Sequence, residues 1–119
     1  MSRHDDVVRL HHMRDHADEA IRMAGGRAYD GFISDRMAHL ALLHLVEIVG
    51  EAASRVSPET AGACSSIPWS HITGMRHRIV HGYDRIDFPL LWKTIQEDLP
   101  LLIEQLDQAI ARLEAERKK

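Results

Sequence analysis

A helix-forming stretch decides the fold of this chain: it runs from Asp35 to Val56 and reads DRMAHLALLHLVEIVGEAASRV. Its apolar residues recur at steps of three and four and cover more than half of the circumference of a helix. A helix that apolar lies at the centre of a bundle or in an interface. Ser34 or Asp35 can cap its N-terminus, and Ser57-Pro58 ends it, because a residue before proline avoids the helical region. We therefore expect a central helix over about residues 34–56.

The segments on either side predict further helices. The expected elements are a first helix that ends at Gly25-Gly26, a loop over residues 58–68, a short helix over about 69–80 that stops near Gly82, and a last helix capped by Asp87. Pro100 should kink or split the last helix. The polar tail over residues 112–119 should fray. The pattern predicts one all-α domain over residues 1–119, an up-and-down bundle of four to five helices.

The composition fits a small cytoplasmic domain. The 119 residues are 45% hydrophobic, and 15 Lys and Arg against 18 Asp and Glu give a net charge of -3. This balance argues against a disordered chain and against a protein that coats nucleic acid through bulk positive charge. The single cysteine, Cys64, excludes an intrachain disulfide. We see no signal peptide at Met1 to Asp6, and the apolar centre is too short and too polar for a membrane span.

The segment most informative about function is IPWSHITGMRHRIVHGYDRID, residues 67–87. No acidic residue occurs from Thr60 through Tyr83, while arginines and histidines gather there. A solvated face, neutralised by acids from other helices, would explain this concentration. An imidazole that titrates near neutrality suits proton transfer, and a guanidinium offers a planar fork to phosphate oxygens. The segment therefore also suits chemistry on a phosphate group.

Residues 76–83, RHRIVHGY, resemble the R-(N/D/H)-x3-H-x-Y signature of the HepT-like ribonucleases, which are HEPN-domain toxins. Residues 47–53 (EIVGEAA) are similar to the E-I-x-G-E-A stretch of that family, and residues 67–76 (IPWSHITGMR) to its I-P-W-x-x-I-x-G-M-R run. Leu91-Trp92 and Asp98-Leu99-Pro100 resemble the start of its last helix. The resemblance covers about residues 5–112 in order. His77 departs from the commoner Asn, which puts the local hydrogen bonding in question.

The resemblance implies a function. It implies a dimeric HEPN bundle that cleaves RNA without a metal ion or a cofactor, as the toxin of a toxin–antitoxin pair. The partner implied is a minimal nucleotidyltransferase antitoxin that silences the toxin by attaching AMP to a tyrosine. Carried over to this sequence, Arg76 and His81 would be catalytic and Tyr83 would accept AMP. His77 and Arg78 would support them from the same segment, and Glu47 and Glu51 from the second helix.

Helical geometry adds a condition. Positions 76 and 81 lie about 140° apart around an ideal helix, so they do not share a face, whereas 77 and 81 do, and so do 76 and 83. Arg76 and His81 can therefore converge only if the helix ends near Gly82 or if motifs pair across a dimer. We expect the dimer to form through the second helix and the motif helix.

Two other functions stay open. The chain could be a catalytically inactive HEPN subunit that binds a nucleotidyltransferase, or a histidine-rich metal-binding bundle, since His77 and His81 have the spacing of two ligands on one helix. No HExxH pattern is present, and we expect no metal site. Ordinary structural roles are expected for the remaining histidines and tryptophans: an exposed polar face for His12 and His16, satisfied core or interface positions for His39 and His44, and core anchors for Trp69 and Trp92.

Overall fold

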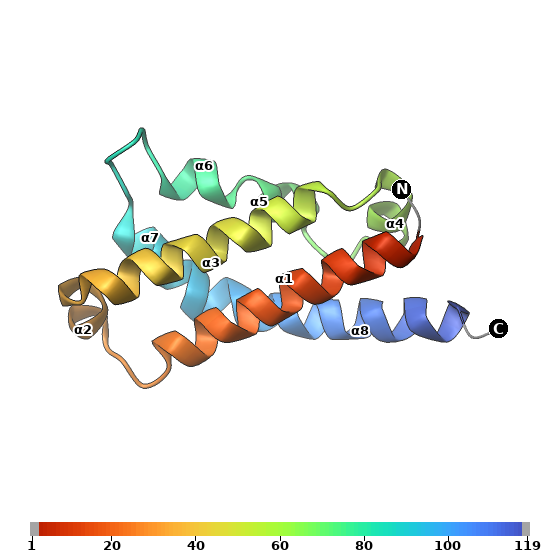
Figure 1. Ribbon diagram of the computed structural model, residues 1–119, viewed down its shortest axis with the longest axis horizontal. Coiled ribbons are helices and arrows are strands. Elements are labelled where there is room, and N and C mark those ends of the chain that lie inside the picture. The colour runs from red at the N-terminus through yellow and green to blue at the C-terminus, as the bar shows by residue number, and fades with distance from the viewer. Residues whose placement is uncertain (1–2, 118–119) are drawn as a thin grey trace.

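The protein is an up-and-down helical bundle, and the computed structural model describes residues 3–117 (Figure 1). Its elements are α1 (Arg3–Ala24), α2 (Tyr29–Ser34), α3 (Arg36–Ser54), α4 (Pro58–Ala63), α5 (Trp69–Thr73), α6 (Met75–Ile79), α7 (Phe88–Lys93), the π-helical η1 (Thr94–Asp98) and α8 (Leu99–Arg117). The only β feature within residues 3–117 is one isolated bridge between Val80 and Ile86. The predicted all-α fold class is confirmed.

Helix α3 is the centre of the bundle, because α1 packs along one side of it and α5 and α6 along the other (Figure 1). Its apolar surface is therefore used mostly inside one chain. Asp35 caps the helix and accepts a hydrogen bond from the Ala38 N–H at 3.1 Å. This bond and the Arg27 guanidinium, 3.0 Å away, lower the pKa of Asp35. By length and composition α3 could cross a membrane, but 56% of its apolar window is buried in the fold, as in the core helices of soluble proteins.

Two short helices lie where the sequence predicts none. The stretch expected to be a loop contains α4, which begins with Pro58 in its first turn and with Ser57 as its cap. The Ser57 hydroxyl oxygen accepts from the Thr60 N–H at 3.3 Å, so the Ser-Pro pair that ends α3 also starts the next helix. Helix α2 carries Phe32, which is fully buried against the rings of Tyr29 and Trp92.

The short helix expected over about residues 69–80 has nearly the predicted bounds, but it is not continuous. It is split at Gly74 into α5 and α6, and α6 ends at Ile79. The backbone of Val80 is extended, because it belongs to the β-bridge with Ile86. The motif segment thus leaves the helix before it reaches His81.

The last helix begins and bends as predicted, but its tail differs. Asp87 caps α7 by accepting from the Leu90 N–H at 3.0 Å, and the π-helical turn η1 interrupts the helix just before Pro100, which has no N–H to donate. The tail over residues 112–119 was expected to fray, and in the structure α8 continues to Arg117. Leu113 is buried and Arg112 bonds the Ala63 carbonyl, so packing against the bundle holds this end. Residues 118–119 lie outside the described residues.

Candidate active site

Arg76 and Glu47 meet across α6 and α3. The Arg76 Nε donates to the Glu47 Oε2 at 2.8 Å, and the side chains keep 56% and 30% of their surface exposed. Helix α5, which directly precedes α6, comes close to α3 because residue 50 is a glycine: a Cβ there would lie 3.3 Å from the carbonyl oxygen of Ile72. Of the two glutamates predicted to support the motif, Glu47 therefore contacts a motif residue. Glu51 instead pairs at 3.0 Å with Arg55, the residue that follows α3.

A tight backbone hairpin fixes the position of His81. The His81 N–H donates to the Arg85 carbonyl at 2.6 Å, and the Asp87 N–H donates to the Ile79 carbonyl at 2.7 Å. Gly82 has a φ of +84°, which side-chain-bearing residues rarely adopt. The turn holds His81 and Tyr83 out from the bundle, and both are exposed, with Tyr83 at 103% of its reference surface.

The ideal-helix geometry predicted for this segment does not apply, because α6 ends at Ile79. His77 lies on the helix and His81 on the hairpin, so the two do not share a helical face as metal ligands would. Tyr83 likewise is not two helical turns beyond Arg76. Among residues 3–117 no group of three or more His, Cys, Asp or Glu side chains is placed to hold a metal ion.

Arg78 has a structural contact. Its guanidinium folds back and donates to the His71 carbonyl at 2.5 Å, and His71 in turn lies 3.4 Å from Asp98 on η1. Gly74 makes room for this fold, since a Cβ there would lie 2.9 Å from the Arg78 guanidinium. Arg78 thus links α6 to α5. In the sequence, only Gly74, at the break between the two helices, could have indicated this contact.

A hollow of about 480 Å³ opens beside His81. Its other walls come from the hairpin and the start of α7, and its lining residues are His81, Asp84, Arg85, Ile86, Asp87 and Phe88. Asp87 is engaged in capping α7, whereas Arg85 is exposed and carries a permanent positive charge. An imidazole and a guanidinium at one hollow can move a proton and hold a phosphate oxygen.

The tryptophans and two of the histidines for which the sequence predicts structural roles lie as follows. The Trp69 indole N–H donates to the Cys64 carbonyl at 3.1 Å, and Trp92 stacks on Phe32. His44 is exposed. The expectation that His39 is satisfied is wrong: it is buried between Phe32 and Phe88, and neither ring nitrogen has a hydrogen-bond partner among the described residues.

Comparisons with known proteins identify the family. The family described as "Ribonuclease HepT-like" matches residues 13–109. "Putative RNase MJ1380" of Methanocaldococcus jannaschii is 29% identical over 107 residues, which cover 90% of this chain and 98% of that protein. "Probable ribonuclease HepT" of Thermococcus cleftensis is 32% identical over 74 residues, 62% of this chain and 67% of that protein. No solved structure matches significantly. Since the match spans most of the bundle and includes the Arg76–His81 segment, the chain belongs to the HepT-like ribonuclease family.

Proposed function

We propose that this protein is a metal-independent RNA endonuclease and acts in the cytoplasm as the toxin of a toxin–antitoxin pair. One observation carries the proposal: the hairpin that follows α6 fixes an exposed His81, and on α6 itself Arg76 is held by Glu47 of α3. Family membership and the names of the relatives support the ribonuclease activity. The catalytic roles and the toxin role follow from the resemblance of the motif.

The reaction needs one base, one acid and one cation. His81 accepts the proton of a ribose 2′-hydroxyl, and the freed oxygen attacks the adjacent phosphorus. The bond from phosphorus to the 5′ oxygen breaks, and an imidazolium returns a proton to that leaving oxygen. The products are a 2′,3′-cyclic phosphate and a 5′-hydroxyl end. Arg76 stabilises the negative charge that develops on the phosphorane oxygens.

A two-fold dimer would supply the second motif histidine. Two large apolar side chains on the first half of α3 are exposed, Met37 at 85% and Leu40 at 39%. Both side chains lie on α3, the helix of Glu47. A two-fold contact formed by them and by α6 would therefore bring the motif segments of two protomers together. This pairing supplies two imidazoles, one for each proton transfer.

Tyr83 is the proposed acceptor of AMP from a nucleotidyltransferase antitoxin. The full exposure of its side chain leaves the phenol open to a partner enzyme. Each attached AMP adds a phosphate that stays ionised at neutral pH, close to His81 and Arg85. RNA would then be excluded by charge repulsion and by the bulk of the adenosine.

Purified protein tests the proposal directly. We expect cleavage of RNA in the presence of EDTA, and a mass increase of whole AMP units after incubation with the cognate transferase and ATP. Tyr83→Phe should keep cleavage, provided that the phenol has no catalytic role, and escape the modification. A protein that binds the transferase but cuts no RNA would instead be the catalytically inactive subunit.

A further inference from the structure

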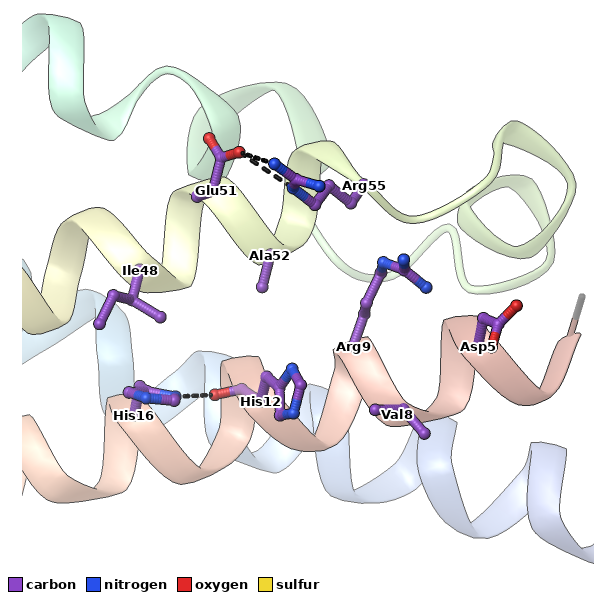
Figure 2. Close-up of a pocket in the computed structure, with 9 residues that line it drawn as sticks. All are labelled: Asp5, Val8, Arg9, His12, His16, Ile48, Glu51, Ala52 and Arg55. Carbon is purple, nitrogen blue, oxygen red and sulfur yellow. Dashed lines mark hydrogen bonds and ion pairs between the residues drawn. The ribbon is translucent and has the colours of Figure 1, made fainter. Parts of the chain in front are cut away.

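A groove of about 450 Å³ runs between α1 and α3 (Figure 2). Val8 of α1 and Ile48 and Ala52 of α3 give it an apolar floor, and Val8 keeps 38% of its surface exposed. The charges around this floor balance, because the lining holds two carboxylates and two guanidiniums: Asp5, Glu51, Arg9 and Arg55. An apolar floor inside a balanced polar rim is the pattern of a protein–protein contact.

An apolar side chain projects from the same face of α3 near its other end. Met37 is 85% exposed, and Leu40, one turn later, is 39% exposed. Met37, His44 and Glu51 follow one another at steps of seven residues, so on an ideal helix they lie within about 40° of one another. His44 and Glu51 are exposed as well, and Glu51 lines the groove. One open face of α3 therefore carries a protruding methionine near its start and the groove near its end.

A second copy of the chain complements this face. In a two-fold contact each protomer uses the same surface, so a residue that meets a second residue of the partner is met in return by its equivalent. A two-fold axis that crosses α3 at His44, midway between Met37 and Glu51, makes the two α3 helices antiparallel and brings Met37 of each copy to the groove of the other. The flexible methionine side chain adapts to such an irregular apolar gap. The same axis brings the exposed Arg36 close to the level of Glu51 of the partner subunit, so opposite charges face each other.

The same axis also aligns the two motif segments. Glu47 of α3 holds Arg76 of α6, and these two helices run in opposite directions (Figure 1). Three residues further along each helix, His44 is level with Ile79, where α6 ends just before His81. An axis that crosses both α3 helices at this level keeps the two motif segments level with each other and on the same flank of the pair. The partner then supplies the second imidazole that the proposed reaction needs, so the site is incomplete in one copy.

We propose that two copies pair through antiparallel α3 helices about His44, and that Met37 of each copy fills the groove between α1 and α3 of the other. The inference rests on the dimer of the proposed function and gives that dimer its register and its contact residues. A contact through Met37 and Leu40 alone, at the start of α3, would leave both apolar grooves open to solvent. The antiparallel register covers them and uses the whole exposed face of the helix.

Cysteine cross-linking with copper–phenanthroline tests this register, because a disulfide needs two Cα atoms within about 7 Å of each other. His44→Cys places two thiols at the axis, and the double variant Met37→Cys/Glu51→Cys places thiols opposite each other across the interface. Both should give a covalent dimer on a denaturing gel that dithiothreitol reverses. The matched controls are the single variants Met37→Cys and Glu51→Cys, whose two thiols in the dimer lie about 21 Å apart along the helices. They should stay monomeric on the gel, as should the wild type with its buried Cys64.

The outcomes separate this interface from the proposed function. All three changed side chains are exposed, and urea unfolding verifies that each variant is folded. A covalent dimer of the Met37→Cys single variant, or none from His44→Cys and the double variant, would overturn the register, while RNA cleavage by the wild type would leave the ribonuclease proposal intact. The expected cross-links together with a wild type that cuts no RNA would support the interface and overturn the ribonuclease proposal instead.

Discussion

At the scale of single residues, Glu47 determines where the Arg76 guanidinium lies, since the two meet at 2.8 Å on an open surface. The pair is too exposed to add much to stability, as isolated surface ion pairs contribute about 0–1 kcal/mol. In the proposed reaction its value is positional: without the carboxylate, the long arginine side chain would sample many rotamers and would lose that freedom on binding the RNA phosphate.

We therefore expect Glu47→Ala to reduce RNA cleavage about tenfold, mainly through KM, and Glu47→Gln to recover part of the loss because the amide oxygen still accepts the hydrogen bond. Cleavage kinetics on one RNA oligonucleotide measure both constants. Glu59→Ala, an exposed residue of α4, serves as the control and should cleave like the wild type. Equal activity in all four proteins would show that Arg76 needs no support from α3.

A second residue-scale prediction concerns Asp6, which is 1% exposed and joins α1 to the cap of α4. Burial alone would raise the pKa of Asp6, but hydrogen bonds from the Ser57 and Thr60 hydroxyls, both at 2.6 Å, and from the Ser57 N–H outweigh it and lower the pKa. A lowered pKa in the folded state means that the ionised carboxylate stabilises the fold above pH 3.8, its ordinary pKa. This contribution is lost as the pH falls through the folded pKa.

Asp6→Asn should accordingly lower the free energy of unfolding by about 1–3 kcal/mol at pH 7. The difference from the wild type should be smaller at pH 3 than at pH 7, because the stabilisation by the carboxylate decreases once the pH falls below 3.8. Urea unfolding at the two pH values measures it. A difference that is the same at both would contradict the role of the carboxylate charge.

At the scale of elements, the hairpin after α6 matters most, because it sets the position of His81. Periodicity and caps predicted α1, α3 and the start of α7, since each depends on local signals such as Gly25-Gly26, Asp35 and Asp87. The hairpin could not be predicted in this way, because its β-bridge joins Val80 to Ile86 and competes with the helical spacing of residues 76–80. Helix α4 was missed because its small residues resemble a loop, although Ser57-Pro58 signals a helix start.

Two glycines with positive φ test the importance of this hairpin. Gly82 (φ +84°) and Gly26 (φ +76°) both have no atom within 4 Å of an added Cβ, so alanine meets only backbone strain, about 1–2 kcal/mol at either position. We expect Gly82→Ala and Gly26→Ala to lower stability by similar amounts in urea unfolding. Only Gly82→Ala should also lose RNA cleavage. If both variants kept full cleavage, the exact course of the hairpin would be irrelevant to the reaction.

At the scale of the whole molecule, the sequence predicted the bundle and its central helix and gathered Arg76, His81 and Tyr83 in one segment. The apolar circumference of α3 fitted either a central helix or an interface. Packing against α1, α5 and α6 inside one chain uses most of it, and a pattern of apolar positions cannot distinguish that from an interface. What remains exposed at the N-terminal half of the helix is Met37 and Leu40.

Those two side chains define the dimer prediction. A stable two-fold interface should bury more than roughly 1,000 Å² in total, and light scattering at micromolar concentration should give twice the mass of 13.5 kDa. Met37→Asp places a charge in that contact, so it should shift the protein to a monomer and reduce cleavage with it. A wild type that is monomeric at this concentration would contradict the paired-motif mechanism.

The central claim is that His81 transfers a proton in RNA cleavage without a metal ion. The most direct test is the rate at which pure wild-type protein and its His81→Ala variant cleave one RNA oligonucleotide in the presence of EDTA, with unfolding measured on both. We predict cleavage by the wild type and a loss of at least about 10²-fold in the variant at unchanged stability, the usual scale for a positioned proton-transfer group. Near-wild-type cleavage by folded His81→Ala protein, or wild-type cleavage that EDTA abolishes, would contradict the account.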